Sequence, residues 1–458
     1  MSQRAFVSSD LTKGSISDHI KAIAAPAAIG FLFNTLFNVV DSIYAGRVGT
    51  DALAGLALSF PIFFLVLSIS SGIGNATSAL TSIALGKKDK NEFHQLLTHA
   101  LGMAVLISIF IAFFSRSITG FLFSLTGAEG DSLSIGVNYT SMILNGFIFF
   151  MFNFILNGLL YAQGNSKPFR NYLIFGFFAN IVLNPLLIFG FWIVPSFGVI
   201  GIAIATIIVQ AGGVLYLGYY IIRSSEFDFS RLKKVKVKLL TIMDILKQGI
   251  PSTMSTATIA IGIFIINYFV LLYGGSETVA AYGVSLRIEQ LALIPTIGLN
   301  VAALSIVGQN FGANQFDRID EARKKTTLYG VTIMLIGAVI IFPFAPYLIS
   351  LFDSNPSVVS AGTTYLRIET LAFTTYVFIN ISISVLQGIK KPGFAIYLGL
   401  YRQIFPIVIF YTLGTLLGWG IYGVWWGIVF INWSAVFIVV FYTSYQLRKI
   451  RKEKATQE

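Results

Sequence analysis

The sequence contains no cysteine, only three histidines, and few charged residues. Without cysteine the chain can form no disulfide, no thiolate metal site and no cysteine nucleophile. The histidines, His19, His94 and His99, lie at or near the ends of expected helices. No HExxH motif and no GxxxxGK[ST] phosphate loop occurs, so the sequence predicts neither a zinc hydrolase nor an ATP-driven pump.

Charged residues make up 11% of the chain, hydrophobic residues 55%, and the mean hydropathy is +0.79. Soluble domains average about 25% charged residues. This composition predicts a polytopic membrane protein. The net charge of +11 lies in loops that flank apolar segments, so it does not indicate nucleic-acid binding. The polar start, up to Asp18, does not resemble a cleaved signal peptide, and the first membrane helix is expected to serve as the insertion signal.

Twelve segments are apolar and long enough to cross a bilayer as helices, which takes about 20 residues each. β-barrel strands would be shorter and would alternate in polarity. The expected spans are 20–45, 53–83, 95–119, 134–162, 168–191, 198–222, 246–273, 279–308, 323–350, 357–388, 394–416 and 420–447.

The basic residues place both termini on one side of the membrane. Lys and Arg concentrate on the cytoplasmic side of membrane proteins. The two termini and alternate loops hold 26 of the 31 basic residues, whereas the opposite loops hold only Arg47 and Arg116. We therefore expect cytoplasmic termini and a multi-pass protein of the cell membrane, in particular a bacterial inner membrane.

The two halves of the chain repeat each other at an offset of 226 residues. Gly49 matches Gly275, Ser59 matches Ser285, and the Gly86 that closes a helix matches Gly312. The segments AQGNSKP and LQGIKKP, which begin at Ala162 and Leu386, also match. Six spans precede the repeat, so both copies have the same orientation, with an axis along the membrane normal.

The fold class expected from these patterns is an all-α polytopic membrane protein with twelve helices in two pseudo-symmetric six-helix lobes. The expected divisions are an N-lobe at 1–222, a cytoplasmic linker at 223–245, a C-lobe at 246–447 and a basic tail at 448–458.

Asp41 is a lone carboxylate in the first apolar segment. A charge within a membrane helix costs roughly 2.5–3.5 kcal/mol on insertion scales, so such residues tend to be functional. A carboxylate that faces a cavity can hold a proton or a cation. The alternative is an interfacial Asp that reaches the membrane surface from about one turn before the helix end.

Several asparagines lie at helical spacing from Asp41 or from one another. Asn34 and Asn38 share a helix face with Asp41, at spacings of four and three residues. Two further i,i+4 pairs occur, on the fourth and fifth spans: Asn153 with Asn157, and Asn180 with Asn184. Each of these asparagines could contact a substrate or could simply hydrogen-bond between helices.

Two other features concern the helices themselves. Pro26 removes a backbone hydrogen bond and should kink the first span.

The second half carries charges inside its spans: Arg287, Glu289, Arg367, Glu369 and Arg402. We interpret these as a cluster of ion pairs, with a second ion site at Glu289 or Glu369 as the alternative. The position that matches Asp41 is Asn267, so the lobes are not equivalent.

Taken together, the motifs resemble the multidrug and toxic compound extrusion (MATE) transporters, especially their DNA-damage-inducible-F-type branch. The resemblance covers nearly the whole chain. It rests on the six-plus-six repeat, on Pro26 and the NxxD that ends at Asp41, and on VGTDALAG from Val48. It also rests on QGN at Gln163, RIE at Arg287, VGQNFGA at Val307 and QGIKKP at Gln387.

The resemblance implies a non-enzymatic exporter of cationic or amphipathic organic compounds, driven by an inward proton or sodium gradient. It implies alternating access and a role in antibiotic resistance. It places Asp41 at the coupling site, with Tyr139, Asn157, Asn180 and Asn184 around it, and it implies that the helix bends at Pro26 when Asp41 changes protonation. We expect small-molecule drugs and membrane lipids as partners, no nucleic acid, no cofactor, and a monomer.

One departure bears on the coupling ion. Similar proteins can carry a second acid where this chain has Asn184. A single carboxylate can cycle a proton, but it is a weaker cage for sodium, so protons are favoured and Na⁺ near Asp41 is the alternative. No other metal site is expected.

The sequence supports two other functions less well. A flippase for lipid or lipid-linked oligosaccharide, from the same superfamily, would be expected to have a strongly cationic cavity. The one clear charge inside the first-half spans is acidic instead. An intramembrane enzyme or receptor would need a nucleophile with its base, or a metal constellation, and the sequence offers neither.

Overall fold

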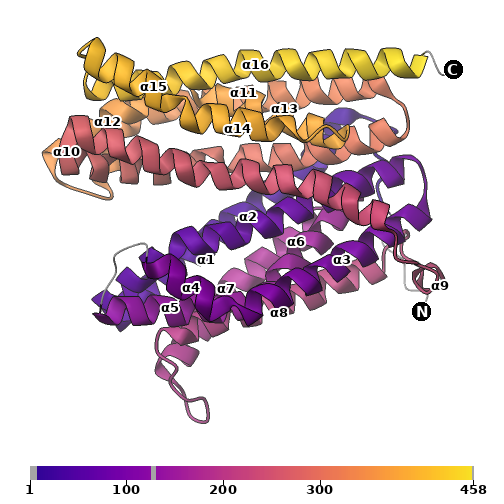
Figure 1. Cartoon of the computed structure of the whole chain (residues 1–458), viewed down its shortest axis with the longest axis horizontal. Helices are drawn as coiled ribbons and strands as arrows, with labels where there is room; N and C mark the ends of the chain where they lie inside the picture. The colour runs from indigo at the N-terminus through magenta and orange to yellow at the C-terminus, as the bar shows by residue number, and fades with distance from the viewer. Residues whose placement is uncertain (1–7, 125–129, 456–458) are drawn as a thin grey trace. The chain divides into compact units, whose positions relative to one another are not determined.

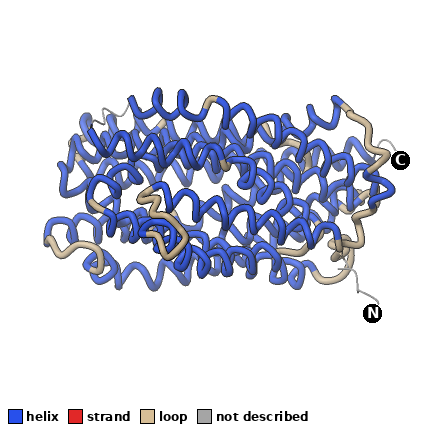
Figure 2. Tube along the Cα trace, turned by 90° about the horizontal axis from the view of Figure 1, so that it is seen from below, coloured by secondary structure: helices blue, strands red, loops and turns tan. Residues whose placement is uncertain are grey.

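The computed structural model describes residues 8–124 and 130–455. Over this part of the chain the regular structure is helical, apart from one isolated bridge between Phe191 and Val194. Figure 2 shows the trace as helix almost throughout, with short loops between the helices. A membrane leaves backbone polar groups no water to bond, and helices satisfy those groups internally.

The helices follow in this order: α1 (Ile16–Val48), α2 (Thr50–Gly86), α3 (Lys90–Phe113), α4 (Ser115–Ser124), α5 (Gly130–Asn145), α6 (Phe147–Ala162), α7 (Lys167–Phe189), α8 (Ile200–Ile222), α9 (Phe229–Leu232), α10 (Leu239–Gly312), α11 (Phe316–Ser350), α12 (Pro356–Glu369), α13 (Phe373–Gly388), α14 (Phe394–Ile404), α15 (Pro406–Tyr411), the π-helical turn η1 (Thr412–Leu416) and α16 (Ile421–Ala455).

The number of spans agrees with the sequence. In the described residues, nine helices are long and apolar enough to cross a membrane, and two bent pairs, α5 with α6 and α12 with α13, add two more. Within α10, Gly275 adopts φ 73° and ψ −175°, which divides its 74 residues into two helices. Counting α10 twice gives twelve spans. The all-helical, twelve-span prediction is confirmed.

The backbone itself repeats at the offset seen in the sequence. Left-handed φ values occur at Gly49 and Gly275, at Lys88 and Asn314, at Gly164 and Lys390, and at Trp192 and Gly418. Each pair is separated by 226 residues. The fourth span of each half is also broken at matching places, with bends of 48° and 52°. The internal duplication is therefore present in the local geometry of both halves.

The chain divides into two compact units. Unit 1 comprises residues 1–13 and 29–253, and unit 2 comprises residues 14–28 and 254–458. Two helices pass from one unit to the other, α1 after Ala28 and α10 after Thr253. Each crossing lies two residues beyond a proline, Pro26 or Pro251. A proline inside a helix removes one backbone hydrogen bond, so both crossings lie at weakened turns.

In unit 1, α2 packs along α5 and α6, and α7 packs against α8. Gly74 of α2 and Gly158 of α6 bring the two backbones together: a Cβ on Gly158 would lie 2.5 Å from the Gly74 carbonyl oxygen. Glycine permits this approach because it has no side chain, and small residues allow membrane helices to pack closely.

In unit 2, α11 packs on α12 and α13, and α13 packs on α16. Figure 1 shows α14 beside α16, and these two helices are also in contact. Caps define the helix ends locally. Asn355 accepts from the Ser357 N–H at 2.9 Å, and Pro356 follows as the first residue of α12. Both are residue types that favour a helix start.

The segment after α8 is held to α3 by two histidines. His94 Nε2 accepts from the Asp228 N–H at 2.8 Å, and His99 Nε2 accepts from the Lys238 N–H at 2.9 Å. Each ring also bonds through Nδ1 to the carbonyl four residues before it, at 2.6 and 2.7 Å. A carbonyl can only accept and an amide N–H can only donate, so both rings are neutral with the proton on Nδ1.

Candidate ion-coupling site

Asp41 lies two turns before the end of α1 and is 6% exposed. It is buried within unit 1 and does not reach the surface as an interfacial residue would. Asp41, Glu289 and Glu369 are the only buried carboxylates in the described residues. A buried charge requires partners.

The partners of Asp41 come from α7 and α8. Asn180 Nδ2 and Asn184 Nδ2 each donate to Asp41 Oδ1 at 2.9 Å, and Thr206 Oγ1 lies 3.4 Å from Oδ2. Asn184 also donates to Asn180 Oδ1 at 3.2 Å. Hydrogen bonds to a charged group contribute about 1.5–3 kcal/mol each, so this set stabilises an ionised carboxylate.

Pro185 explains part of this contact between α1 and α7. It has no N–H, so the Ile181 carbonyl four residues earlier lacks its helical partner. The Tyr44 hydroxyl donates to that carbonyl at 3.1 Å. Tyr44 is one turn beyond Asp41, so both residues fasten α1 to α7. Neither Tyr44 nor Thr206 was identified from the sequence; its position as a polar residue in a mostly apolar span is the only signal for Thr206.

The site can present oxygen ligands as well as N–H donors. The buried Asn184 Oδ1 has no hydrogen-bond partner among the described atoms. Amide orientation in Asn is assigned from the hydrogen-bond network, and a flipped amide would present oxygen instead of N–H. Asp41 with turned Asn180 and Asn184 would then offer four side-chain oxygens, two from the carboxylate and one from each amide. Tyr139, also buried, lies within electrostatic range of Asp41.

The other polar residues expected at the site lie apart from the Asp41 carboxylate. Asn38 is exposed, and its side chain donates to the Asn34 carbonyl of its own helix at 2.9 Å. Asn153 donates to Gln210 Oε1 at 2.7 Å, in a separate group that includes Tyr172. Helical spacing places side chains on one face, but it does not determine which of them meet a partner.

The last two residues predicted in the first half of the chain are Asn157 and Pro26. Asn157 is buried in α6, and no hydrogen bond joins it to Asp41 in the described structure. Pro26 lies inside α1, which stays helical on both sides of it.

The charges predicted as one cluster in the second half fall into two groups. Arg287 and Arg367 are exposed, and the Arg367 guanidinium lies over the Phe342 ring and donates to the Phe342 carbonyl at 3.2 Å. Glu289 and Glu369 are buried. In the described residues no ion pair within 4.0 Å joins these charges to one another, which corrects the expectation of fixed ion pairs.

Tyrosines take the place of the expected ion pairs. Tyr365 donates to Glu289 Oε2 at 3.1 Å, and Tyr376 donates to Glu369 Oε1 at 2.9 Å. Glu369 Oε2 is buried without a hydrogen-bond partner among the described atoms.

The remaining base of this group faces an amide. Arg402 is half-buried and donates through Nε and Nη2 to Asn432 Oδ1 at 3.1 and 2.8 Å. The Arg402 guanidinium carbon also lies 5.6 Å from the centre of the Tyr376 ring. Glu289, Glu369 and Arg402 lie within electrostatic range of one another, and with Tyr365 and Tyr376 they form a second polar group, which we call the tyrosine–glutamate cluster. It lies entirely in unit 2.

Comparison with known proteins agrees with this architecture. The MatE family model matches residues 26–186 and 251–412, one match in each half of the chain. The chain belongs to the MATE family. Both matched segments begin at the prolines near which α1 and α10 pass between units. The chain is thus a multi-pass transporter of the cell membrane and not an enzyme, as the motifs had indicated.

Relatives of this MATE chain cover most of its length. It is 29% identical over 398 residues to the probable multidrug resistance protein YpnP of Bacillus subtilis, with 84% of each chain covered. It is 23% identical over 398 residues to the multidrug export protein MepA of Staphylococcus aureus, with 86% of each covered.

Two solved structures resemble the chain over nearly its full length. A multidrug resistance MATE family transporter in an outward-facing conformation matches with a TM-score of 0.90 at 25% identity, covering 96% of this chain and 98% of that one. A MOP superfamily transporter from Pyrococcus furiosus, whose binding pocket is described as reversed in polarity, also gives 0.90 at 25%, covering 96% and 97%.

Proposed function

We propose that this MATE protein is a secondary active multidrug exporter in which the protonation of Asp41 is coupled to the release of a cationic or amphipathic substrate. The observation that carries the proposal is the buried Asp41 carboxylate, held by Asn180, Asn184 and Thr206. The names of the multidrug resistance and multidrug export relatives support the substrate class.

The coupling follows from competition for one charge. An ionised Asp41 attracts a cation, and a protonated Asp41 does not. Burial makes the ionised form costly whenever its partners are disturbed. A proton and a cationic substrate therefore exclude each other, and loading one releases the other. Alternating access between two lobes of six helices each would let the two exchange on opposite sides of the membrane.

Protons are the favoured coupling ion because the site carries one carboxylate. The donors Asn180 and Asn184 suit an ionised carboxylate that takes up a proton and returns it. Sodium would need both amides to turn their oxygens inward, which removes two hydrogen bonds to Asp41. We further propose that the chain acts as a monomer and belongs to the DNA-damage-inducible-F-type branch, in line with the NxxD motif that ends at the buried Asp41.

The test is ethidium efflux from proteoliposomes under proton and sodium gradients imposed separately. Asp41→Asn keeps the size and hydrogen-bonding capacity of the side chain, so the protein should fold, but gradient-driven efflux should fall to the level of empty liposomes. The matched control is Asp131→Asn, which removes an exposed carboxylate at the start of α5. Wild-type efflux in Asp41→Asn would reject the assignment of Asp41, and efflux independent of any gradient would reject the exporter mechanism.

The tyrosine–glutamate cluster supports a second candidate for coupling. Two buried carboxylates beside a single half-buried guanidinium cannot both be ionised at low cost. We propose that Glu289 and Glu369 hold a proton or a cation between them. The atom that binds it would be Glu369 Oε2, which has no hydrogen-bond partner among the described atoms. Glu369→Gln should then change the number of ions moved per substrate, whereas the exposed Glu277→Gln should not. An unchanged ion-to-substrate ratio would leave the cluster a structural role.

A lipid or lipid-linked oligosaccharide flippase remains the alternative function. Failure of efflux under both gradients in wild-type protein, together with movement of a fluorescent lipid between leaflets, would favour it. Against it stands the acidic, not cationic, buried charge of unit 1.

A further inference from the structure

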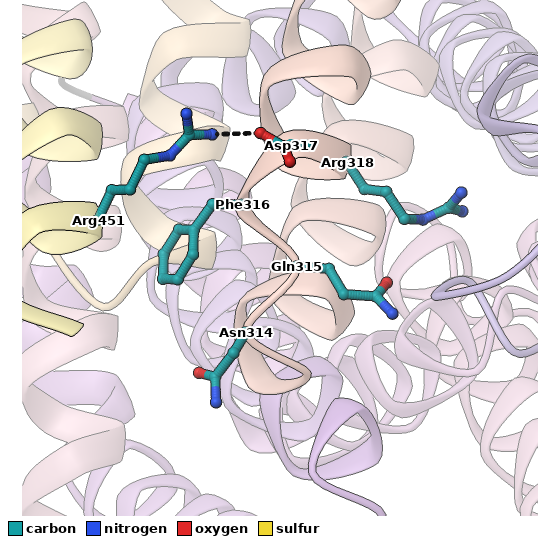
Figure 3. A pocket seen from close by; sticks show the side chains of 6 residues that line it. All are labelled: Asn314, Gln315, Phe316, Asp317, Arg318 and Arg451. Carbon is teal, nitrogen blue, oxygen red and sulfur yellow. Dashed lines mark hydrogen bonds and ion pairs between the residues drawn. The ribbon is translucent and has the colours of Figure 1, made fainter. Parts of the chain in front are cut away.

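Two adjoining cavities lie where the start of α11 meets the end of α16. One measures about 490 Å³ and is lined by residues 314–318 with Arg451 (Figure 3). The other measures about 310 Å³ and lies farther along α11 and α16. They share Phe316 and Arg451. All of these residues belong to unit 2. We call the smaller cavity the basic groove.

The basic groove is positively charged. Four basic side chains and one acidic side chain line it, the bases being Arg323, Lys324, Arg448 and Arg451, and the acid Asp320. The charge of Arg451 is already paired with two carboxylates. Its Nη2 donates to Asp317 Oδ1 at 2.9 Å, drawn as a dashed line in Figure 3, and to Asp320 Oδ2 at 3.0 Å. The three other bases supply the excess charge.

Those three bases have unused donors. Arg323 donates through Nη1 to Ser444 Oγ at 2.9 Å, which holds its guanidinium at the groove. The side chains of Lys324 and Arg448 are exposed and form neither a hydrogen bond nor an ion pair within residues 8–124 and 130–455. A planar guanidinium on one wall and an ammonium beside it suit the oxygens of a phosphate group.

The groove also adjoins apolar surface on both helices. Leu328, one turn from Lys324 on α11, is 61% exposed. On α16, Tyr445 and Phe441 are 52% and 77% exposed, one and two turns from Arg448. Residues four apart share a helix face, and each advances about 1.5 Å along the axis. On each helix, then, exposed apolar side chains lead directly to the basic end.

We propose that the basic groove binds the phosphate-bearing headgroup of an anionic phospholipid, whose acyl chains lie along the exposed faces of α11 and α16. A soluble anion would use the charges but not the apolar surface that leads to them. Basic pockets between membrane helices are suited to anionic lipid headgroups. The distribution of Lys and Arg predicts that this end faces the cytoplasmic leaflet, where anionic lipids gather. The bound lipid would join α11 to α16, two helices of the same unit.

The test uses the full-length protein in nanodiscs made of equal parts phosphatidylglycerol and phosphatidylcholine with the same acyl chains. The protein is extracted with dodecyl maltoside, and native mass spectrometry counts each lipid retained. The wild type should retain phosphatidylglycerol preferentially. The triple variant Arg323→Gln/Lys324→Gln/Arg448→Gln should lose that preference by about tenfold or more, since each base contributes to attraction near the surface.

The matched control is Lys233→Gln/Lys234→Gln/Lys236→Gln, which removes three exposed charges from the segment between α9 and α10. Its lipid preference should equal that of the wild type. An equal loss in this control, or an unchanged preference in the groove variant, would overturn the proposal. Arg448→Gln alone, monodisperse by gel filtration, gives the same comparison if the triple variant fails to fold.

A competition arm separates lipid from soluble anion. Inorganic phosphate or glycerol phosphate, at the same concentration as phosphatidylglycerol, should leave the retained lipid unchanged. Complete displacement would identify a small-anion site and would reject the lipid assignment. Because the readout is bound lipid and not efflux, its failure is independent of any failure of the exporter function.

Discussion

Asn184 Nδ2 donates to Asp41 Oδ1 at 2.9 Å, across the contact between α7 and α1. The relationship pairs a neutral amide with the one buried carboxylate among the described residues of unit 1. The identity of the residue at position 184 therefore determines how much negative charge surrounds the coupling site.

We predict that Asn184→Asp shifts the coupling ion toward sodium. A second carboxylate about 3 Å from Asp41 adds an attraction for a cation that a neutral amide lacks, and the apparent sodium affinity should rise about tenfold or more. Ethidium efflux from proteoliposomes, measured against sodium concentration at constant pH, gives the affinity.

The control for this change is Asn38→Asp, which adds the same charge to an exposed position one turn before Asp41. Its sodium dependence should match that of the wild type. If both variants respond alike, the effect comes from general surface charge and not from the site.

We predict that Gly158→Ala destabilises unit 1. The added Cβ would lie 2.5 Å from the Gly74 carbonyl oxygen, a backbone atom that cannot turn away. Overpacking of this kind costs typically about 1–3 kcal/mol. The thermal midpoint, followed by loss of monodisperse protein in detergent on heating, should fall by several degrees.

The comparison variant is Gly102→Ala on α3, where an added Cβ meets nothing within 4 Å. In a helix interior this change should be neutral or stabilise by up to about 1 kcal/mol. Equal midpoints for the two variants would show that α2 and α6 can move apart at no cost.

We predict that His99→Phe frees the backbone near the start of α10. The change removes the acceptor for the Lys238 N–H and keeps an aromatic ring. Loss of one hydrogen bond should speed exchange of that amide by about threefold to tenfold. Hydrogen–deuterium exchange with mass spectrometry measures it on a peptide that contains residue 238.

The same variant contains its own control, because the Asp228 N–H still bonds to His94. A peptide around residue 228 should exchange as in the wild type. Release of the 228 peptide in His99→Phe at neutral pH would mean that the segment opens as one piece.

We predict a small acid-dependent contribution from Asp10, which lies before the first span. Although burial opposes it, hydrogen bonds from the Thr12 hydroxyl and N–H, with Lys13 and Lys88 nearby, lower the pKa of this carboxyl. A lowered pKa in the folded state gives stability that is present above the unfolded value, near 3.9, and lost as pH falls through the folded value. Asp10→Asn should flatten thermal stability against pH below about pH 4, and Asp131→Asn should not.

Hydropathy and residue spacing were enough to predict the class of this protein. Apolar runs of about 20 residues can only cross a membrane as helices, so the count of twelve followed from hydropathy. The repeat at 226 residues was also visible in the sequence. Matching glycines such as Gly49 and Gly275 adopt left-handed φ values at the same place in each half. Asp41 stood out because a carboxylate in an apolar helix is costly.

Which polar groups meet depends on how helices distant in the chain pack together. Helical spacing placed Asn38 and Asp41 on one face, but Asp41 alone is buried against α7, and its third partner, Thr206, comes from α8. The charges Arg287 and Glu289 are close in sequence, yet one is exposed and the other is bonded to Tyr365. Side chains two residues apart on a helix point in different directions, and their partners belong to helices distant in the chain. No local pattern carries that information.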